Sequence, residues 1–156
     1  MNQESLWQFA LAAYGRDGME SVCLALQDQQ GININVLLWS LWLDHNAVGF
    51  DRGFWQQSVQ AINAVHARVV RVRSLRRWIP KRRGLLWLRN PVKAWELRLE
   101  KSELMQLQNL TDFRIRLSFN RPDQINIRQA DILKYLMDIG LHTCGKAAQD
   151  QFTGAI

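Results

Sequence analysis

The sequence predicts an all-α protein: a single domain, residues 1–156, of five or six helices around a long, basic central helix, with one extended segment near residues 112–120. Apolar residues recur at steps of three and four over most of the chain, which is the spacing of one helix face. Residues that favour helix starts and ends divide the chain at short intervals. With 156 residues and 47% hydrophobic residues, the chain can bury a core.

Two helices are predicted at the start of the acidic N-terminal part, residues 1–51. Ser5 is a favourable N-cap for the stretch LWQFALAAY, and Gly15 is placed to end that helix. Asp17 is expected to cap a second helix through GMESVCLALQDQQ, which Gly31 would stop.

Asn33 or Asn35 then opens a third helix through INVLLWSLWL, whose apolar run is about half of a membrane span. We therefore expect a buried helix and no transmembrane segment. No basic run precedes an apolar stretch at the N-terminus, so no secretory signal is predicted and the cytoplasm is the expected location. Cys23 and Cys144 are accordingly expected to be reduced.

The basic part, residues 52–95, is predicted to hold the long helix and a turn. Asp51 is a plausible cap, and apolar residues recur on one face until Pro80 ends the helix after Ile79. The stretch KRRG would form a turn, LLWLRN a brief helical turn, and Pro91 the first position of the next helix.

The C-terminal helices are expected within residues 96–140. Glu96, Glu100 and Glu103 would lie on an exposed charged face of the first of them. In DFRIRLSF, apolar and polar residues alternate as in a strand, so this stretch is expected to be extended, either on the helices or paired across a dimer. A short helix ending near Gly140 and a flexible tail, residues 141–156, would follow.

Charge is sharply separated along the chain. Residues 1–51 have a net charge of −5, residues 52–95 carry eleven cations and no carboxylate, and residues 96–156 are neutral. On a helix, Arg68 and Arg71 fall on one flank of the apolar face, Arg73 and Arg77 fall on the other, and Arg76 falls within it. One solvated face cannot hold all five, so some of these arginines are expected to meet a partner.

Three partners for the basic segment remain open. The first is internal: carboxylates of the acidic part, such as Asp28, Asp44 and Asp51. The second is phosphate, gripped by arginine forks while Trp78 and Trp87 stack on unpaired bases. The third is an acidic protein, an anionic membrane surface, or the acidic half of a second copy in a homodimer.

The seven tryptophans are expected to be mostly core residues. The alternative is a Trp-lined apolar pocket of an enzyme or ligand-binding protein, with Asp44, His45 and Asp51 as its polar groups. Those three are better explained as a polar helix end with caps. His66 is expected to be a hydrogen-bonded core or boundary residue. No phosphate loop, nucleophile elbow or paired-cysteine metal motif occurs, so no catalytic residue, metal or cofactor is predicted.

Part of the chain resembles a family of short proteobacterial proteins catalogued as a domain of unknown function. The resemblance covers roughly residues 5 to 107. It implies one soluble, helical bacterial domain, and it implies no reaction, cofactor or catalytic residue. The residues that carry it are Leu6-Trp7, Phe9-Ala10, Tyr14, Cys23-Leu24, Leu26-Gln27-Asp28, Gly31, Asn33, Asn35, Leu37-Leu38, Leu41-Trp42, the LRR of residues 75–77 and the stretch ELRLEKSEL.

The residues therefore predict a non-enzymatic binding protein with an anion-receptive surface. Its partner would be RNA, a ribonucleoprotein or an acidic protein. The surface is predicted to comprise Arg71, Arg73, Arg76, Arg77, Lys81, Arg82 and Arg83, flanked by Trp78 and Trp87.

Overall fold

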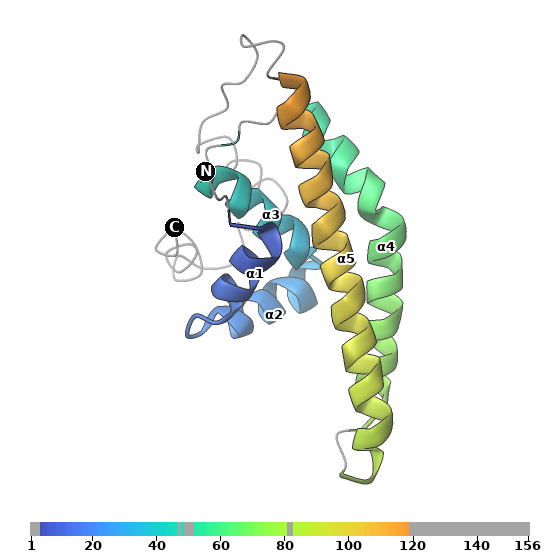
Figure 1. Ribbon diagram of the computed structural model, residues 1–156. Helices are drawn as coiled ribbons and strands as arrows, with labels where there is room; N and C mark the ends of the chain where they lie inside the picture. Colours follow the sequence, from blue (N-terminus) through green and yellow to red (C-terminus); the bar gives the residue numbers. More distant parts are fainter. Residues whose placement is uncertain (1–3, 47, 49–51, 81–82, 119–156) are drawn as a thin grey trace.

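The computed structural model describes residues 4–46, 48, 52–80 and 83–118. This part of the chain is all-α, as predicted, with five α-helices and no strand. Helices α4 and α5 run side by side as a long hairpin, and α1, α2 and α3 cluster against one side of it (Figure 1). The elements are α1 (Leu6–Tyr14), α2 (Met19–Gln30), α3 (Ile34–His45), α4 (Arg52–Trp78), the 3₁₀ turn η1 (Arg83–Leu85) and α5 (Leu86–Ser118).

The helix starts and ends mostly follow the predicted local chemistry. Ser5 forms a capping box with Gln8, because its hydroxyl accepts from the Gln8 N–H while its own N–H donates to the Gln8 side chain. Asn33 caps α3 by accepting from the Asn35 N–H at 3.0 Å. Gly31 ends α2 in the left-handed region with φ 66°.

The predicted cap of α2 is wrong. Gly18 occupies the N-cap position instead of Asp17, with φ 82° and no side-chain hydrogen bond. A left-handed backbone at this position favours glycine, so the start of α2 depends on backbone freedom and gains nothing from a carboxylate cap.

The core lies between α3 and the hairpin and contains three of the tryptophans. Trp39, Trp42 and Trp55 are buried, and each indole N–H finds an acceptor. Trp39 donates to Thr111 Oγ1 at 2.9 Å, and Trp42 donates to the Glu4 carbonyl oxygen at 2.9 Å. Trp55 donates to Ser40 Oγ at 3.4 Å. Three of the seven tryptophans are therefore core residues, which is fewer than predicted, because Trp78, Trp87 and Trp95 are exposed.

The end of α4 is held by a side chain of the opposite helix. Helix α4 ends at Trp78, just before Pro80, as predicted. Arg89 of α5 donates from one guanidinium nitrogen to the carbonyl oxygens of Arg76 and Ile79, both at 2.7 Å. The Arg76 carbonyl belongs to the last turn of α4, where intrahelical donors run out, and Ile79 is the first residue after the helix.

Helix α5 is longer than predicted at both ends. It begins at Leu86, so Pro91 lies inside it and does not open it. It continues to Ser118, so the extended segment predicted near residues 112–120 is wrong for the residues that the structure describes. The alternation of Phe113 and Leu117 with arginines does not reflect a strand, because the face that packs contains Leu107 and Thr111 at helical spacing.

The remaining C-terminal predictions, the helix ending near Gly140 and the tail at 141–156, lie outside the described residues. Among the helices that the structure describes, none combines the length and apolar character needed to cross a membrane.

Candidate functional site

Two of the predicted surface arginines are turned inward. Arg73 donates from Nε to Glu96 Oε1 at 2.9 Å and from a terminal nitrogen to Glu100 Oε1 at 2.6 Å. Arg76 bonds both oxygens of Glu96, with its Nε on Oε2 and a terminal nitrogen on Oε1. These are charge-assisted bonds between α4 and α5, so neither guanidinium is available as a solvent-exposed anion site.

Arg77 and Arg71 remain on the surface. Arg77 pairs with Asp28 of α2, and both side chains are about half exposed. Arg71 is exposed and makes no ion pair within the described part of the chain. Arg83 begins η1, and Lys81 and Arg82 lie outside the described residues.

The internal partner expected for the basic segment is thus present for three arginines, but its carboxylates are not those expected. Only Asp28 belongs to the acidic N-terminal part; Glu96 and Glu100 come from α5.

Trp78 and Trp87 are both solvent-exposed. Trp78 is 80% exposed at the end of α4, and Trp87 is 70% exposed at the start of α5. Trp95, two turns further along α5, is 53% exposed. The hairpin end that carries them extends beyond the three-helix cluster (Figure 1). Leu75, Leu86 and Leu88 are exposed in the same region, so this end of the molecule carries an apolar surface.

The segment that forms the hairpin end has many cations in its sequence. Residues 52–95 contain eleven cations and no carboxylate, and among the described residues three carboxylates from outside this range pair with arginines within it. The exposed tryptophans and leucines therefore lie in a segment whose sequence is rich in cations. We use the name hairpin-end surface for the exposed residues of this end of the hairpin, namely Arg71, Leu75, Trp78, Leu86, Trp87, Leu88 and Trp95.

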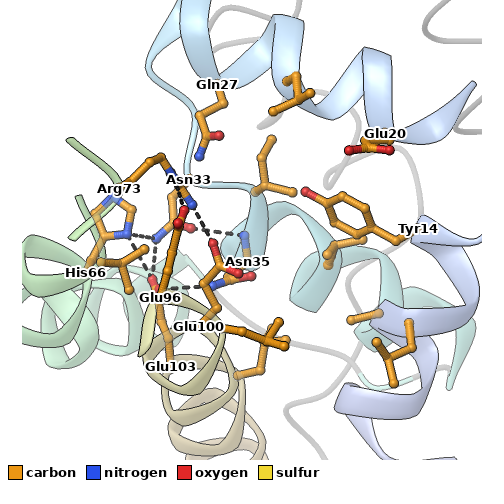
Figure 2. Close-up of a pocket in the computed structure, with 18 of the residues that line it drawn as sticks. Tyr14, Glu20, Gln27, Asn33, Asn35, His66, Arg73, Glu96, Glu100 and Glu103 are labelled. Carbon is orange, nitrogen blue, oxygen red and sulfur yellow. Dashed lines mark hydrogen bonds and ion pairs between the residues drawn. The ribbon is translucent and has the colours of Figure 1, made fainter. Parts of the chain in front are cut away.

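A pocket of about 380 Å³ lies where α1, α2 and α3 meet the hairpin. Its apolar side is lined by residues that include Trp7, Leu11 and Leu24. Its opposite side is a polar cluster, and the Tyr14 hydroxyl and Glu20 lie across the pocket from it (Figure 2). The cluster comprises Asn33, Asn35, His66, Arg73, Arg76, Glu96, Glu100 and Glu103.

Glu103 is the centre of the cluster and is fully buried. Its Oε1 accepts from the Asn33 amide and lies 3.1 Å from His66 Nδ1, and its Oε2 accepts from the Asn35 amide at 2.9 Å. The expectation that His66 is a hydrogen-bonded boundary residue is confirmed, since its side chain is 28% exposed. One carboxylate therefore links α3, α4 and α5.

Burial sets the ionisation of the groups beside this cluster. Burial raises the pKa of the Glu100 carboxyl, and the bond from Arg73 only partly opposes this. Burial also lowers the pKa of Arg73, but the bonds to Glu96 and Glu100 outweigh it and leave that pKa raised. The pKa of the Tyr14 phenol is raised by burial and by the negative charge of its neighbours, so the phenol stays protonated.

The polar cluster was not predicted from the sequence. Glu96 and Glu103 were expected on an exposed face, but they are 5% and 0% exposed. A signal was present: Glu96, Glu100 and Glu103 recur at steps of four and three on α5, while Arg73 flanks the apolar face of α4 and Arg76 falls within it. Two complementary helix faces of this kind indicate a buried contact when the helices are antiparallel neighbours.

The alternative site at Asp44, His45 and Asp51 does not coincide with the pocket. Neither Asp44 nor His45 lines it, and Asp51 lies outside the described residues. Among the tryptophans, Trp7 lines the pocket, while Trp39 and Trp42 are enclosed in the core. In the described part of the chain, no group of three or more histidine, cysteine or carboxylate side chains is arranged to hold a metal ion.

Comparison with known proteins identifies a family. A family model described as "Protein of unknown function (DUF2390)" matches residues 5–107, from the N-cap of α1 to a buried leucine of α5. This confirms the resemblance seen in the sequence over the same residues. The match includes the hairpin-end surface and all residues named above for the pocket. No curated protein and no solved structure matches the chain.

Proposed function

The chain belongs to this family of proteins of unknown function, and from that premise we propose that it is a binding protein whose hairpin-end surface docks an acidic protein. The observation that carries the proposal is the exposure of two indoles, Trp78 at 80% and Trp87 at 70%, in a segment without carboxylates. The cytoplasmic location expected from the sequence is kept as part of this proposal.

The exposed indoles support a docking role because they are costly to leave in water. Tryptophan and arginine are the residues that most often dominate the binding energy of protein interfaces. Here Trp78 and Trp87 are exposed at the end of the hairpin formed by α4 and α5. The bonds of Arg89 to the carbonyl oxygens of Arg76 and Ile79 fix that end. A preorganised surface loses little conformational freedom on binding.

The composition of the surface favours a protein partner over RNA. Bases stack on indoles, but the exposed leucines Leu75, Leu86 and Leu88 offer no flat face for stacking. Two of the arginines that would have gripped phosphate, Arg73 and Arg76, are bonded to glutamates. A partner protein with an acidic surface and apolar side chains at its centre would complement both the remaining cations and the exposed apolar residues of the hairpin-end surface.

The test is a comparison of partners captured from cells by the wild-type protein and by a Trp78→Ser/Trp87→Ser variant. Since both side chains are exposed, the substitutions leave the core intact. The control is Met105→Ser/Phe113→Ser, which removes two exposed apolar side chains from α5. We expect a partner of acidic isoelectric point that the hairpin-end variant loses and the control retains.

Two treatments separate the alternatives. A protein that is still captured after nuclease treatment and is released by added salt supports the proposal, because the attraction between complementary charges weakens with ionic strength. Capture that disappears with nuclease identifies RNA or a ribonucleoprotein and overturns it. Light scattering at low and high salt tests the homodimer: a salt-sensitive dimer that the Trp78→Ser/Trp87→Ser variant cannot form would replace the acidic partner by a second copy.

A further inference from the structure

We infer that the pocket between the three-helix cluster and the hairpin binds a small organic cation, namely an ammonium or guanidinium group on an apolar body. The inference is independent of the hairpin-end surface. It rests on the shape of the pocket, on the charges of its polar side and on the apolar character of the opposite side.

The pocket is large enough to hold a small molecule. A volume of about 380 Å³ lies within the range of small-molecule sites, for which a few hundred Å³ is typical. The pocket is lined by residues of all five helices, and Tyr14 directs its hydroxyl into it from the side opposite the polar cluster (Figure 2). A ligand here would touch the cluster of α1–α3 and the hairpin at once.

The charged side chains that line the pocket favour a cation. The polar side holds three carboxylates, Glu96, Glu100 and Glu103, against two guanidinium groups, Arg73 and Arg76. At the rim, exposed Glu20 and Lys93 add one charge of each sign. His66 adds a positive charge only when it is protonated. With a neutral imidazole, the polar side therefore carries one surplus negative charge.

The surplus charge belongs to groups that face the pocket. Glu103 is fully buried and bonds two neutral amides and the imidazole, and no arginine or lysine in the described part of the chain pairs with it. Within the residues that the structure describes, Glu100 bonds Arg73 through one carboxylate oxygen and nothing through the other, and its side chain is 26% exposed. A ligand cation beside the other oxygen of Glu100 would pair with it and offset the excess of carboxylates over guanidinium groups on this side of the pocket.

The apolar residues of the pocket favour a ligand with an apolar body. Leu11 and Leu24 line the pocket and are 52% and 42% exposed, so a ligand would remove apolar surface from water there. The Tyr14 hydroxyl can accept from an ammonium group. An apolar body against α1 and α2, with a cation towards Glu100, satisfies both sides.

The experiment uses three probes with one phenyl body: 2-phenylethylamine, 2-phenylethanol and phenylacetate. Binding to the full chain is followed by amide chemical shifts in titrations of the isotope-labelled protein. We expect the amine to bind about tenfold more tightly than the alcohol, as one partly buried charge pair would give. The shifts are expected at residues that line the pocket, such as Leu11, Leu24 and Glu100.

Two variants test the charged side and the apolar side of the pocket separately. Glu100→Gln should remove the preference for the amine, while the matched control Asp112→Asn, on the same helix but outside the pocket lining, should keep it. Leu11→Trp fills the apolar side without touching the cluster and should weaken both amine and alcohol. Equal binding of amine and alcohol, tighter binding of phenylacetate, or shifts confined to the hairpin end would each overturn the inference.

Discussion

Arg73 and Glu96 join the two helices of the hairpin through a 2.9 Å bond from Nε to Oε1, and both side chains are nearly buried. The same carboxylate also bonds Arg76, so one glutamate of α5 neutralises two arginines of α4. The positive charge read from the sequence is therefore not all surface charge. Part of it stabilises the contact on which the hairpin depends.

Replacing this glutamate should be costly. In Glu96→Gln, two nearly buried guanidinium groups lose their shared counter-charge, and we expect a loss of about 3 kcal/mol in the free energy of unfolding. Asp28→Asn is the matched control, because its partner Arg77 is half exposed and the pair should contribute less than about 1 kcal/mol. Urea denaturation measures both, and equal losses would contradict the assignment of Glu96 as the buried partner.

A second prediction concerns the bond between α3 and α5. Thr111→Val keeps the side-chain shape but leaves the buried indole N–H of Trp39 without its acceptor at 2.9 Å. We expect a loss of about 1–3 kcal/mol in the free energy of unfolding. Ser74→Ala removes an exposed hydroxyl of α4 that bonds a carbonyl one turn earlier, and it should change stability by less than about 0.5 kcal/mol. A neutral Thr111→Val would argue against α5 continuing past this residue.

A third prediction tests the hairpin end without a partner. Trp78→Phe/Trp87→Phe should remove the tryptophan emission that acrylamide, an uncharged quencher, reaches most easily, because these indoles are 80% and 70% exposed. Trp39→Phe/Trp42→Phe should leave the readily quenched fraction in place, since both side chains are buried. If quenching is unaffected by the first pair of substitutions, the hairpin-end surface is not open to solvent.

A fourth prediction concerns Cys23. Burial raises the pKa of its thiol from 9.0 to about 11. In a Cys144→Ser background, its reaction with a disulfide reagent at pH 8 should be at least about 100-fold slower than after unfolding in urea, from the scarcity of thiolate alone. A rate that urea does not change would place this thiol outside the core.

The same shift makes stability depend on pH. The folded-state pKa lies above the unfolded one, so the thiol's contribution to stability is complete below pH 9 and is lost as the pH rises towards 11. The unfolding free energy of Cys144→Ser should therefore fall, relative to that of Cys23→Ala/Cys144→Ser, across this range. A constant difference between the two proteins would contradict the raised pKa.

The features that could be predicted from the sequence are those set by local chemistry. Ser5, Gly31 and Pro80 act within a few residues of themselves, so their effects on helix boundaries are visible in the chain. The length of α5 is different, because Thr111 is fixed by Trp39, which lies 72 residues away. A local alternation of apolar and charged residues cannot reveal such a contact.

The candidate sites also combine features that local sequence predicts with contacts that it cannot predict. The position of Arg76 within the apolar face of α4 indicates that it needs a partner, but not that Glu96 provides it. Trp78 and Trp87 were correctly placed beside the turn, since Pro80 separates the two helices. The pocket could not be predicted, because its polar side joins Asn33 with residues 33 and 70 positions away.

Asn33 does two things with one amide group. Its oxygen caps α3, and its nitrogen donates to Glu103 of α5. Serine, threonine or aspartate would keep the cap but has no amide hydrogens to offer that carboxylate, and aspartate would set a second anion against it. Glutamine has the amide but is a poor cap. Asparagine meets both demands with one side chain, so the residue that starts α3 also helps to hold the small helices against the long hairpin.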